Sequence, residues 1–101
     1  MKRGEIWLAD LGYQGKIRPV LILSVSPGPY DRALATYLIR TTSVRGTAYE
    51  VLHQARGMKD GAFDAQGIGT TDYSRFMRRL GKMDDPTLAL IEDKVREWLS
   101  L

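Results

Sequence analysis

The sequence predicts a mainly β protein, in which a small barrel or strongly curved sheet of five or six short strands precedes one amphipathic helix. Three observations support this fold class. Short stretches rich in β-forming residues recur over 4–83, turn-forming residues separate them, and helical spacing of apolar residues begins only after position 84. At 101 residues, we expect one domain over 1–101 that buries a single core.

A first strand is predicted over residues 4–11. Alternation places Ile6 and Leu8 in the core and Trp7 and Ala9 on the opposite face. The glycines of the next loop break this pattern, so the strand ends there.

The stretch 16–26 is the one around which we expect the sheet to be built. Its unbroken apolar run over 20–23, continued by Val25, is typical of a strand buried on both faces. Pro19 cannot donate a ladder hydrogen bond, so it belongs at the start of this strand. Arg18 is then held at the rim of the core, either as a simple cap or as a functional cation.

The later strands follow from the same patterns. Gly67 and Gly69 lie inside one of them and indicate bulges or a close approach of another chain segment. The predicted ranges are 33–40, 48–53, 63–70 and 75–83, with a helical turn near 72–75 as an alternative start of the last strand.

The C-terminal helix has a clear start signal. Asp84 or Asp85 is the expected N-cap, and a proline follows in the first turn. Its apolar stripe is expected to belong to the core and consists of Leu88, Ile91, Val95 and Trp98.

The net charge of +3 is unevenly distributed. Residues 84–101 carry a charge of −3, which leaves +6 on residues 1–83. A basic body favours an anionic partner such as nucleic acid or an acidic peptide. The absence of cysteine fits a reducing compartment, and neither a signal peptide nor a membrane span is evident, so we expect a cytoplasmic protein without membrane contact.

The strong sequence motifs of enzymes are absent. There is no Walker loop, no HExxH, no GxSxG and no cluster of cysteine and histidine. With His53 as the single histidine, neither a zinc site nor a serine triad is favoured. We therefore expect no metal and no cofactor.

One group of polar residues remains as a candidate site. Arg18 begins one inner strand, Thr41 and Thr42 follow the next, and the loop 12–17 leads into Arg18. If the two strands are antiparallel neighbours, the guanidinium and the hydroxyls share one rim, where they form a natural receptor for a phosphate. The alternative is a hydroxyl-rich turn over 41–43 that satisfies its own backbone.

Several blocks of this sequence, taken in order, carry a resemblance. Residues 3–11 read Arg-Gly-Glu-Ile-Trp-Leu-Ala-Asp-Leu, and residues 18–24 read Arg-Pro-Val-Leu-Ile-Leu-Ser. They resemble the N-terminal signature of the MazF/PemK (Kid) family of toxin endoribonucleases. Shorter blocks continue the match along nearly the whole chain, at 41–43, Gly46, 49–51, 70–75 and 79–83.

The resemblance implies a fold and a function. The fold is a CcdB/MazF-like, SH3-like barrel of five to seven strands with a C-terminal helix, assembled as a homodimer. The function is that of a type II toxin, a metal-independent, sequence-specific endoribonuclease that cuts single-stranded mRNA. Attack by the ribose 2′-OH gives a 2′,3′-cyclic phosphate and a 5′-OH. An acidic antitoxin protein is the implied partner, and DNA is contacted only indirectly, through the antitoxin complex.

The same resemblance assigns roles to residues. Arg18 corresponds to the arginine of the family's Arg-Pro motif and Thr41 to the threonine that ends its third strand, both catalytic. Since a guanidinium pKa above about 12 makes a poor proton donor near neutrality, we favour Arg18 as a stabiliser of charge. Kid-type enzymes have an arginine and an aspartate where this chain has Asp64 and Gln66, so Asp64 and His53 are substitute candidates for proton transfer.

Further residues are predicted to contact RNA. The alternative for the arginines is a solvated strand face, and Lys82 belongs to the same basic cluster. The predicted contacts are Tyr13, Lys16, Thr42, Arg75, Arg78 and Arg79.

Two competing functions stay open. A gyrase poison of the CcdB kind resembles this fold and acts through a tryptophan near the end of the C-terminal helix, where this chain has Trp98. A barrel without catalysis that only binds RNA or a peptide is the second alternative.

Overall fold

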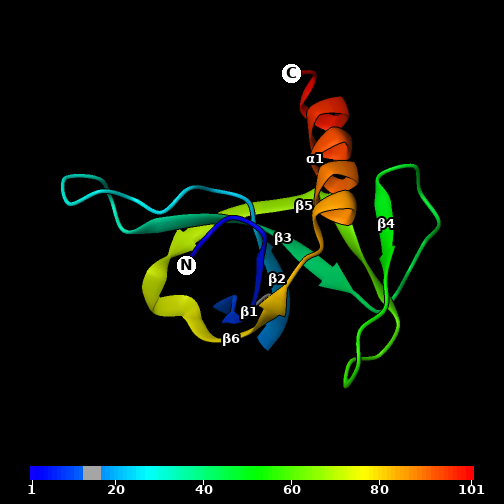
Figure 1. Ribbon diagram of the computed structural model, residues 1–101, viewed down its shortest axis with the longest axis horizontal. Helices are drawn as coiled ribbons and strands as arrows, with labels where there is room; N and C mark the ends of the chain where they lie inside the picture. Colours follow the sequence, from blue (N-terminus) through cyan, green and yellow to red (C-terminus); the bar gives the residue numbers. More distant parts are fainter. Residues whose placement is uncertain (13–16) are drawn as a thin grey trace.

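The computed structural model describes residues 1–12 and 17–101, which form one antiparallel sheet and a C-terminal helix (Figure 1). In the described residues the sheet has six strands in the order β4-β5-β3-β2-β1-β6. The predicted mainly β class is confirmed, although β4 and β6 remain as edges and the barrel is not closed. The elements are β1 (Glu5–Asp10), β2 (Ile17–Ile22), β3 (Leu34–Thr41), β4 (Glu50–His53), β5 (Gly61–Asp72), the 3₁₀ turn η2 (Tyr73–Arg75), β6 (Phe76–Lys82) and α1 (Asp85–Leu99).

Strand β2 is buried on both faces, as its apolar run predicts. Val20, Leu21 and Ile22 are all fully buried, so successive side chains enter the core on both sides. The extension of the strand to Val25 is wrong, because that side chain is 78% exposed. The ladder ends where the Ser24 hydroxyl, in place of a backbone carbonyl, accepts the N–H of Thr36.

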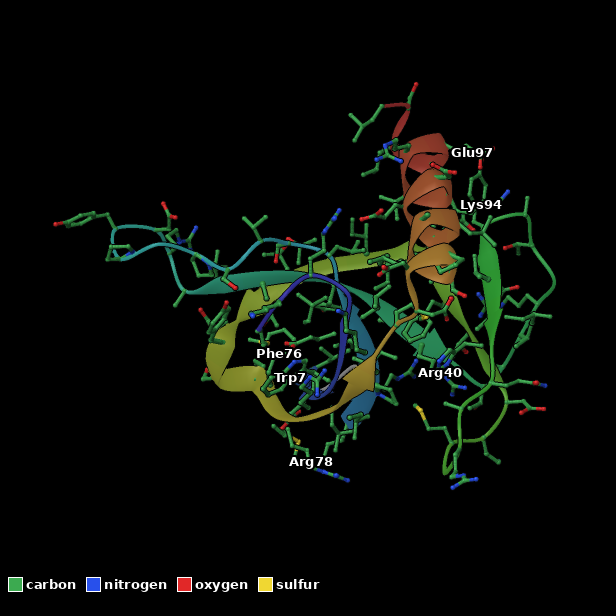
Figure 2. All side chains as sticks on the ribbon, viewed as in Figure 1. Trp7, Arg40, Phe76, Arg78, Lys94 and Glu97 are labelled. Atoms are coloured by element: carbon green, nitrogen blue, oxygen red, sulfur yellow. The ribbon has the colours of Figure 1, made fainter. Side chains whose placement is uncertain are left out.

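The sheet curls so that both of its faces pack. One cluster of buried residues lies under α1, and a second lies on the opposite face with Ala9, Val20 and Phe76. Figure 2 shows Trp7 and Phe76 inside the curl of β1 and β6. Ala9 lies on the face opposite Ile6, as predicted for β1, but this second face is also packed, because Ala9 is fully buried. Two register shifts between β1 and β6 bend the strand, and a bent sheet encloses the face that a flat one leaves in water.

Strand β5 is longer than its prediction. It runs for 12 residues, and Tyr37 of β3 lies across it at Gly69, where a Cβ would be 2.6 Å from the Tyr37 hydroxyl oxygen. The close approach expected at this glycine is thus confirmed, and so is the helical turn before β6.

Helix α1 begins as predicted and ends beyond the core. The Asp84 carboxylate caps it by accepting the N–H of Thr87 at 3.0 Å. Leu88 and Ile91 are buried against the sheet, where α1 packs on β5 and β4 (Figure 1). Trp98 is 44% exposed, so its assignment to the core is wrong. Its ring instead makes an edge contact with Tyr49, at 5.4 Å between centroids, since the last helical turns project past the sheet.

No helix in the described part of the chain is both long and apolar enough to cross a membrane.

Candidate active site

The register of the two central strands brings the candidate residues to one rim. Strands β2 and β3 are antiparallel neighbours, and their pairing sets Val20 opposite Ile39 and Leu21 opposite Leu38. Arg18 precedes the paired part of β2 by two residues and Thr41 follows the paired part of β3 by two, so both lie at the same end of this ladder. The structure therefore meets the condition set by the sequence analysis for a phosphate site, which was that these two strands are antiparallel neighbours.

A pocket of about 540 Å³ opens at this rim. Four residues predicted from the sequence line it together, namely Arg18, Thr41, Thr42 and Arg78. They come from β2, the end of β3 and β6. The curvature of the sheet therefore brings Arg18 and Arg78, which are 60 positions apart in sequence, to one surface. The remaining described lining consists of Leu8, Ile17, Pro19, Arg40, Ser43, Gly57, Met58, Lys59 and Leu80.

The charge of the pocket is of one sign. Arg18, Arg40, Lys59 and Arg78 line it, and no acidic side chain occurs in the described lining. Cations gathered around a concave surface concentrate anions there. The arrangement suits a phosphodiester, which two guanidinium groups and a hydroxyl can bind through charge-assisted hydrogen bonds.

Arg18 also lines a second and smaller pocket of about 260 Å³, with Leu11, Tyr37 and Ile39. Arg18 therefore lies on the rim between two pockets, and the buried part of β2 that follows it holds it there. A cation on such a rigid element is well placed for binding.

The Thr41 hydroxyl takes part in a local turn. Its Oγ1 accepts the backbone N–H of Ser43 at 3.0 Å, which is the hydroxyl-rich turn that the sequence suggested as an alternative. A hydroxyl oxygen that accepts one bond still carries its own hydrogen. The turn thus orients the Thr41 hydroxyl as a donor toward an acceptor such as a phosphate oxygen.

Two cations of the lining were missed by the sequence predictions. Arg40 was treated as the end of a β-strand and Lys59 as part of a loop. Arg40 is only 5% exposed, and burial lowers the pKa of its guanidinium. The available signal was a charged residue directly before the threonine pair, in a strand otherwise rich in apolar residues.

Two predicted RNA contacts lie away from this pocket in the described structure. Arg79 donates from Nε to Oε2 of Glu5 at 3.0 Å on the opposite face of β6. Arg75 lies in η2, with its guanidinium close to the backbone of Gly12. The pKa of Glu5 is lowered, chiefly by the backbone N–H of Lys2 and further by Trp7 and Arg79. These groups therefore stabilise the Glu5 carboxylate in its charged form.

The two proton-transfer candidates have other contacts. His53 accepts a hydrogen bond at Nδ1 from Arg40 Nε, and its ring packs on Phe63 at 5.0 Å between centroids. Asp64 accepts the backbone N–H of Gln66 at 2.9 Å. Neither is part of the described lining of the pocket, so the structure does not bring them together with Arg18 and Thr41.

Tyr13 and Lys16, also predicted to contact RNA, lie outside the described residues. Within residues 1–12 and 17–101, there is no group of three or more histidine, cysteine, aspartate or glutamate side chains placed to hold a metal ion.

Comparisons with known proteins place this chain in a family. Residues 2–99 match the family model of the PemK-like, MazF-like toxins of type II toxin-antitoxin systems. A search of curated proteins with this sequence found no match.

Solved structures of toxins share the fold. A MazF from Deinococcus radiodurans has a TM-score of 0.87 at 22% identity, over 100% of this chain and 97% of that one. An endoribonuclease from a mycobacterial species, solved with its cognate antitoxin, has a TM-score of 0.85 at 25% identity, over 100% of this chain and 96% of that one. The Mycobacterium tuberculosis toxin MazF-mt6 has a TM-score of 0.83 at 24% identity, over 96% and 97% of the two chains.

The family match covers nearly the whole chain, and the sheet, the helix and the toxin structures agree with it. The chain therefore belongs to the PemK-like, MazF-like toxins of type II toxin-antitoxin systems.

Proposed function

We propose that this toxin is a metal-independent endoribonuclease that cuts single-stranded mRNA in the pocket at the end of β2 and β3. The observation that carries this proposal is the joint presence of Arg18, Thr41 and Arg78 in the lining of one pocket, without an acidic side chain in its described part. The cations of such a pocket attract the negatively charged phosphodiester, and no carboxylate of the described lining repels it. The related mycobacterial toxin is itself an endoribonuclease, which supports the same activity here.

The proposed reaction is an internal transesterification. The ribose 2′-oxygen bonds to the adjacent phosphorus, and the bond from phosphorus to the 5′-oxygen breaks. The 2′-hydroxyl loses its proton to water, and the 5′-oxygen takes one from water, so no water is consumed. The products are a 2′,3′-cyclic phosphate and a 5′-hydroxyl.

Arg18 stabilises the charge that develops on the phosphoryl oxygens in this reaction. A guanidinium remains charged near neutrality and donates two parallel N–H bonds, so it acts by electrostatic stabilisation and does not deliver a proton. Thr41 donates its hydroxyl hydrogen to a phosphate oxygen, in the orientation that the Ser43 N–H favours. His53 and Asp64 stay predictions as groups that relay these protons to and from water.

The partners follow from the family and from charge. An antitoxin protein partners the toxin, as in the related mycobacterial complex and in the MazE-MazF complex from Deinococcus radiodurans. An acidic antitoxin segment suits the basic body and competes with RNA for the pocket. We further propose a homodimer that acts on mRNA in the cytoplasm.

RNA end chemistry tests the activity. The purified toxin is incubated with a long mRNA in EDTA, and the ends are mapped. We expect a small set of cuts with 2′,3′-cyclic phosphate and 5′-hydroxyl ends, strongly reduced in the Arg18→Ala variant. RNA that stays intact at a large excess of toxin would contradict the proposal.

A gyrase poison would behave differently. Such a protein needs its C-terminal end, so deletion of residues 98–101 abolishes toxicity while RNA remains uncut in every sample. We expect the opposite: RNA cleavage that survives this deletion, because the exposed end of α1 lies outside the described lining of the pocket.

A further inference from the structure

A buried arginine anchors one wall of the pocket. Arg40 donates from Nε to Nδ1 of His53 at 2.9 Å, and from Nη2 to the backbone oxygens of His53 at 2.9 Å and Lys59 at 2.6 Å. All three acceptors lie at the two ends of the connection between β4 and β5. Figure 2 shows Arg40 beside this connection. A buried guanidinium is costly unless its donors are satisfied, so this set of bonds fixes the connection to β3.

The fit around this guanidinium is tight. A Cβ on Gly61 would lie 2.8 Å from Nη1 of Arg40 and 2.5 Å from the backbone oxygen of Thr41. Any side chain at position 61 would therefore displace the guanidinium or the backbone of Thr41. The anchor and the proposed phosphate ligand share one piece of backbone, so a shift of one moves the other.

The connection held in this way reaches the pocket. Gly57, Met58 and Lys59 line it, together with Arg18 and Arg78. Inside the connection, the bonds of the described residues are local: the Met58 N–H donates to the Ala55 backbone oxygen at 3.1 Å, and Gln54 Nε2 donates to Asp60 Oδ2 at 3.3 Å. Packing is also slight, because most of residues 54–60 are exposed. The position of this wall thus depends on Arg40.

We propose that Arg40 is a positioning residue, which clamps residues 54–60 as a fixed wall of the pocket and thereby sets Lys59 against the backbone of a bound RNA strand. This inference rests on the proposed function and adds to it a third cation, from the β4–β5 connection and not from β2 or β6 as for Arg18 and Arg78. The exposed Lys59 ammonium contacts a phosphate neighbouring the scissile one. Because this contact is made in the ground state as well as in the transition state, it acts on binding more than on the chemical step.

The first test measures binding of a fluorescent single-stranded 2′-O-methyl RNA, which lacks the attacking hydroxyl, as a function of salt. Lys59→Met should weaken binding and flatten the log-log salt slope by ~0.7, the share of one phosphate contact on a single strand. Lys94→Met on α1, which removes the same charge far from the pocket, is the matched control and should leave the slope unchanged (Figure 2). An unchanged slope in Lys59→Met would overturn the contact.

The second test asks whether Arg40 acts through Lys59. Arg40→Lys keeps the charge but cannot hold the three acceptors together, so binding should weaken about as much as in Lys59→Met. The double variant should then be little weaker than either single variant, because positioning is already lost. Simple addition of the two effects would overturn the positioning role.

A third measurement needs no RNA and separates this inference from the proposed function. Hydrogen exchange of amides 54–60 should accelerate in Arg40→Lys, while exchange in β2 is preserved. If Arg40→Lys does not fold, His53→Phe replaces it, since that change removes one acceptor and keeps the ring packing on Phe63. Unchanged exchange in the folded variant would overturn the clamp, whereas a wild-type protein that neither binds nor cuts RNA would overturn the proposed function.

Discussion

Arg78 and Arg79 are neighbours in sequence, but they face two different surroundings. Arg78 pairs with Leu8 across the sheet and lines the pocket, whose described lining holds cations and hydroxyls but no acid. Arg79 pairs with Trp7 on the other face and donates to Glu5. Figure 2 shows Arg78 at the outer side of β6, pointing away from the sheet. The alternation of side chains thus divides this basic run, so that Arg78 faces the pocket and Arg79 binds Glu5 on the other face.

Arg18→Ala should have the largest effect on RNA cleavage. Loss of one preorganised stabiliser lowers RNA cleavage by ~10²-fold or more. The fold should persist, because the core of β2 begins two residues later. Cleavage rates and circular dichroism measure the two effects. Full activity in Arg18→Ala would refute its role.

Thr41→Val should have the next largest effect. It removes one hydroxyl donor to a charged group, a loss of roughly 1.5–3 kcal/mol, or about 10- to 100-fold in cleavage rate. Thr70→Val is the matched control, since its hydroxyl bonds that of Thr36 at 2.8 Å away from the pocket. Equal rates for the two variants would remove Thr41 from the site.

Arg78→Ala and Arg79→Ala sharpen the comparison directly. On uncleavable single-stranded RNA, Arg78→Ala should flatten the log-log salt slope by ~0.7, and Arg79→Ala should leave it unchanged. Arg79→Ala should instead cost a little stability, up to about 1 kcal/mol, because its partly exposed ion pair with Glu5 is lost. A flattened slope in Arg79→Ala together with an unchanged slope in Arg78→Ala would show that Arg79, and not Arg78, contacts the RNA.

The smallest expected effect is a pH dependence through His53. Burial and the neighbouring Arg40 lower its pKa below the ordinary 6.5, against an opposing effect of Asp84. The unfolded chain therefore binds a proton at a higher pH than the folded protein does, and the free energy of unfolding falls as pH drops below about 6.5. Denaturant titrations between pH 7 and 5 measure this slope. Since His53 is the single histidine, His53→Phe should flatten the slope. An equally steep slope in that variant would show that the pH dependence comes from another group.

Much of the fold follows from local sequence signals. The buried run of β2, the N-cap at Asp84 and the close approach at Gly69 were all predictable, because each depends on the chemistry of a few neighbouring residues. Predictions were wrong at Val25 and Trp98, and the packing of the second face around Ala9 was not foreseen, because burial at these positions depends on how far the sheet curves and extends. Curvature arises from register shifts between distant strands, and no single segment carries a signal for them.

The sequence by itself determined that an arginine precedes a doubly buried strand and that a threonine pair ends the next one. Antiparallel pairing of neighbouring strands then places Arg18 and Thr41 at one rim, because strand ends alternate along the chain. Only the tertiary structure decided which other cations join them. Arg78 was selected over Arg79 by the register of β6, and Arg40 and Lys59 by the hydrogen bonds between β3 and a distant connection. Such contacts depend on positions far apart in sequence, which meet only when the sheet has curled.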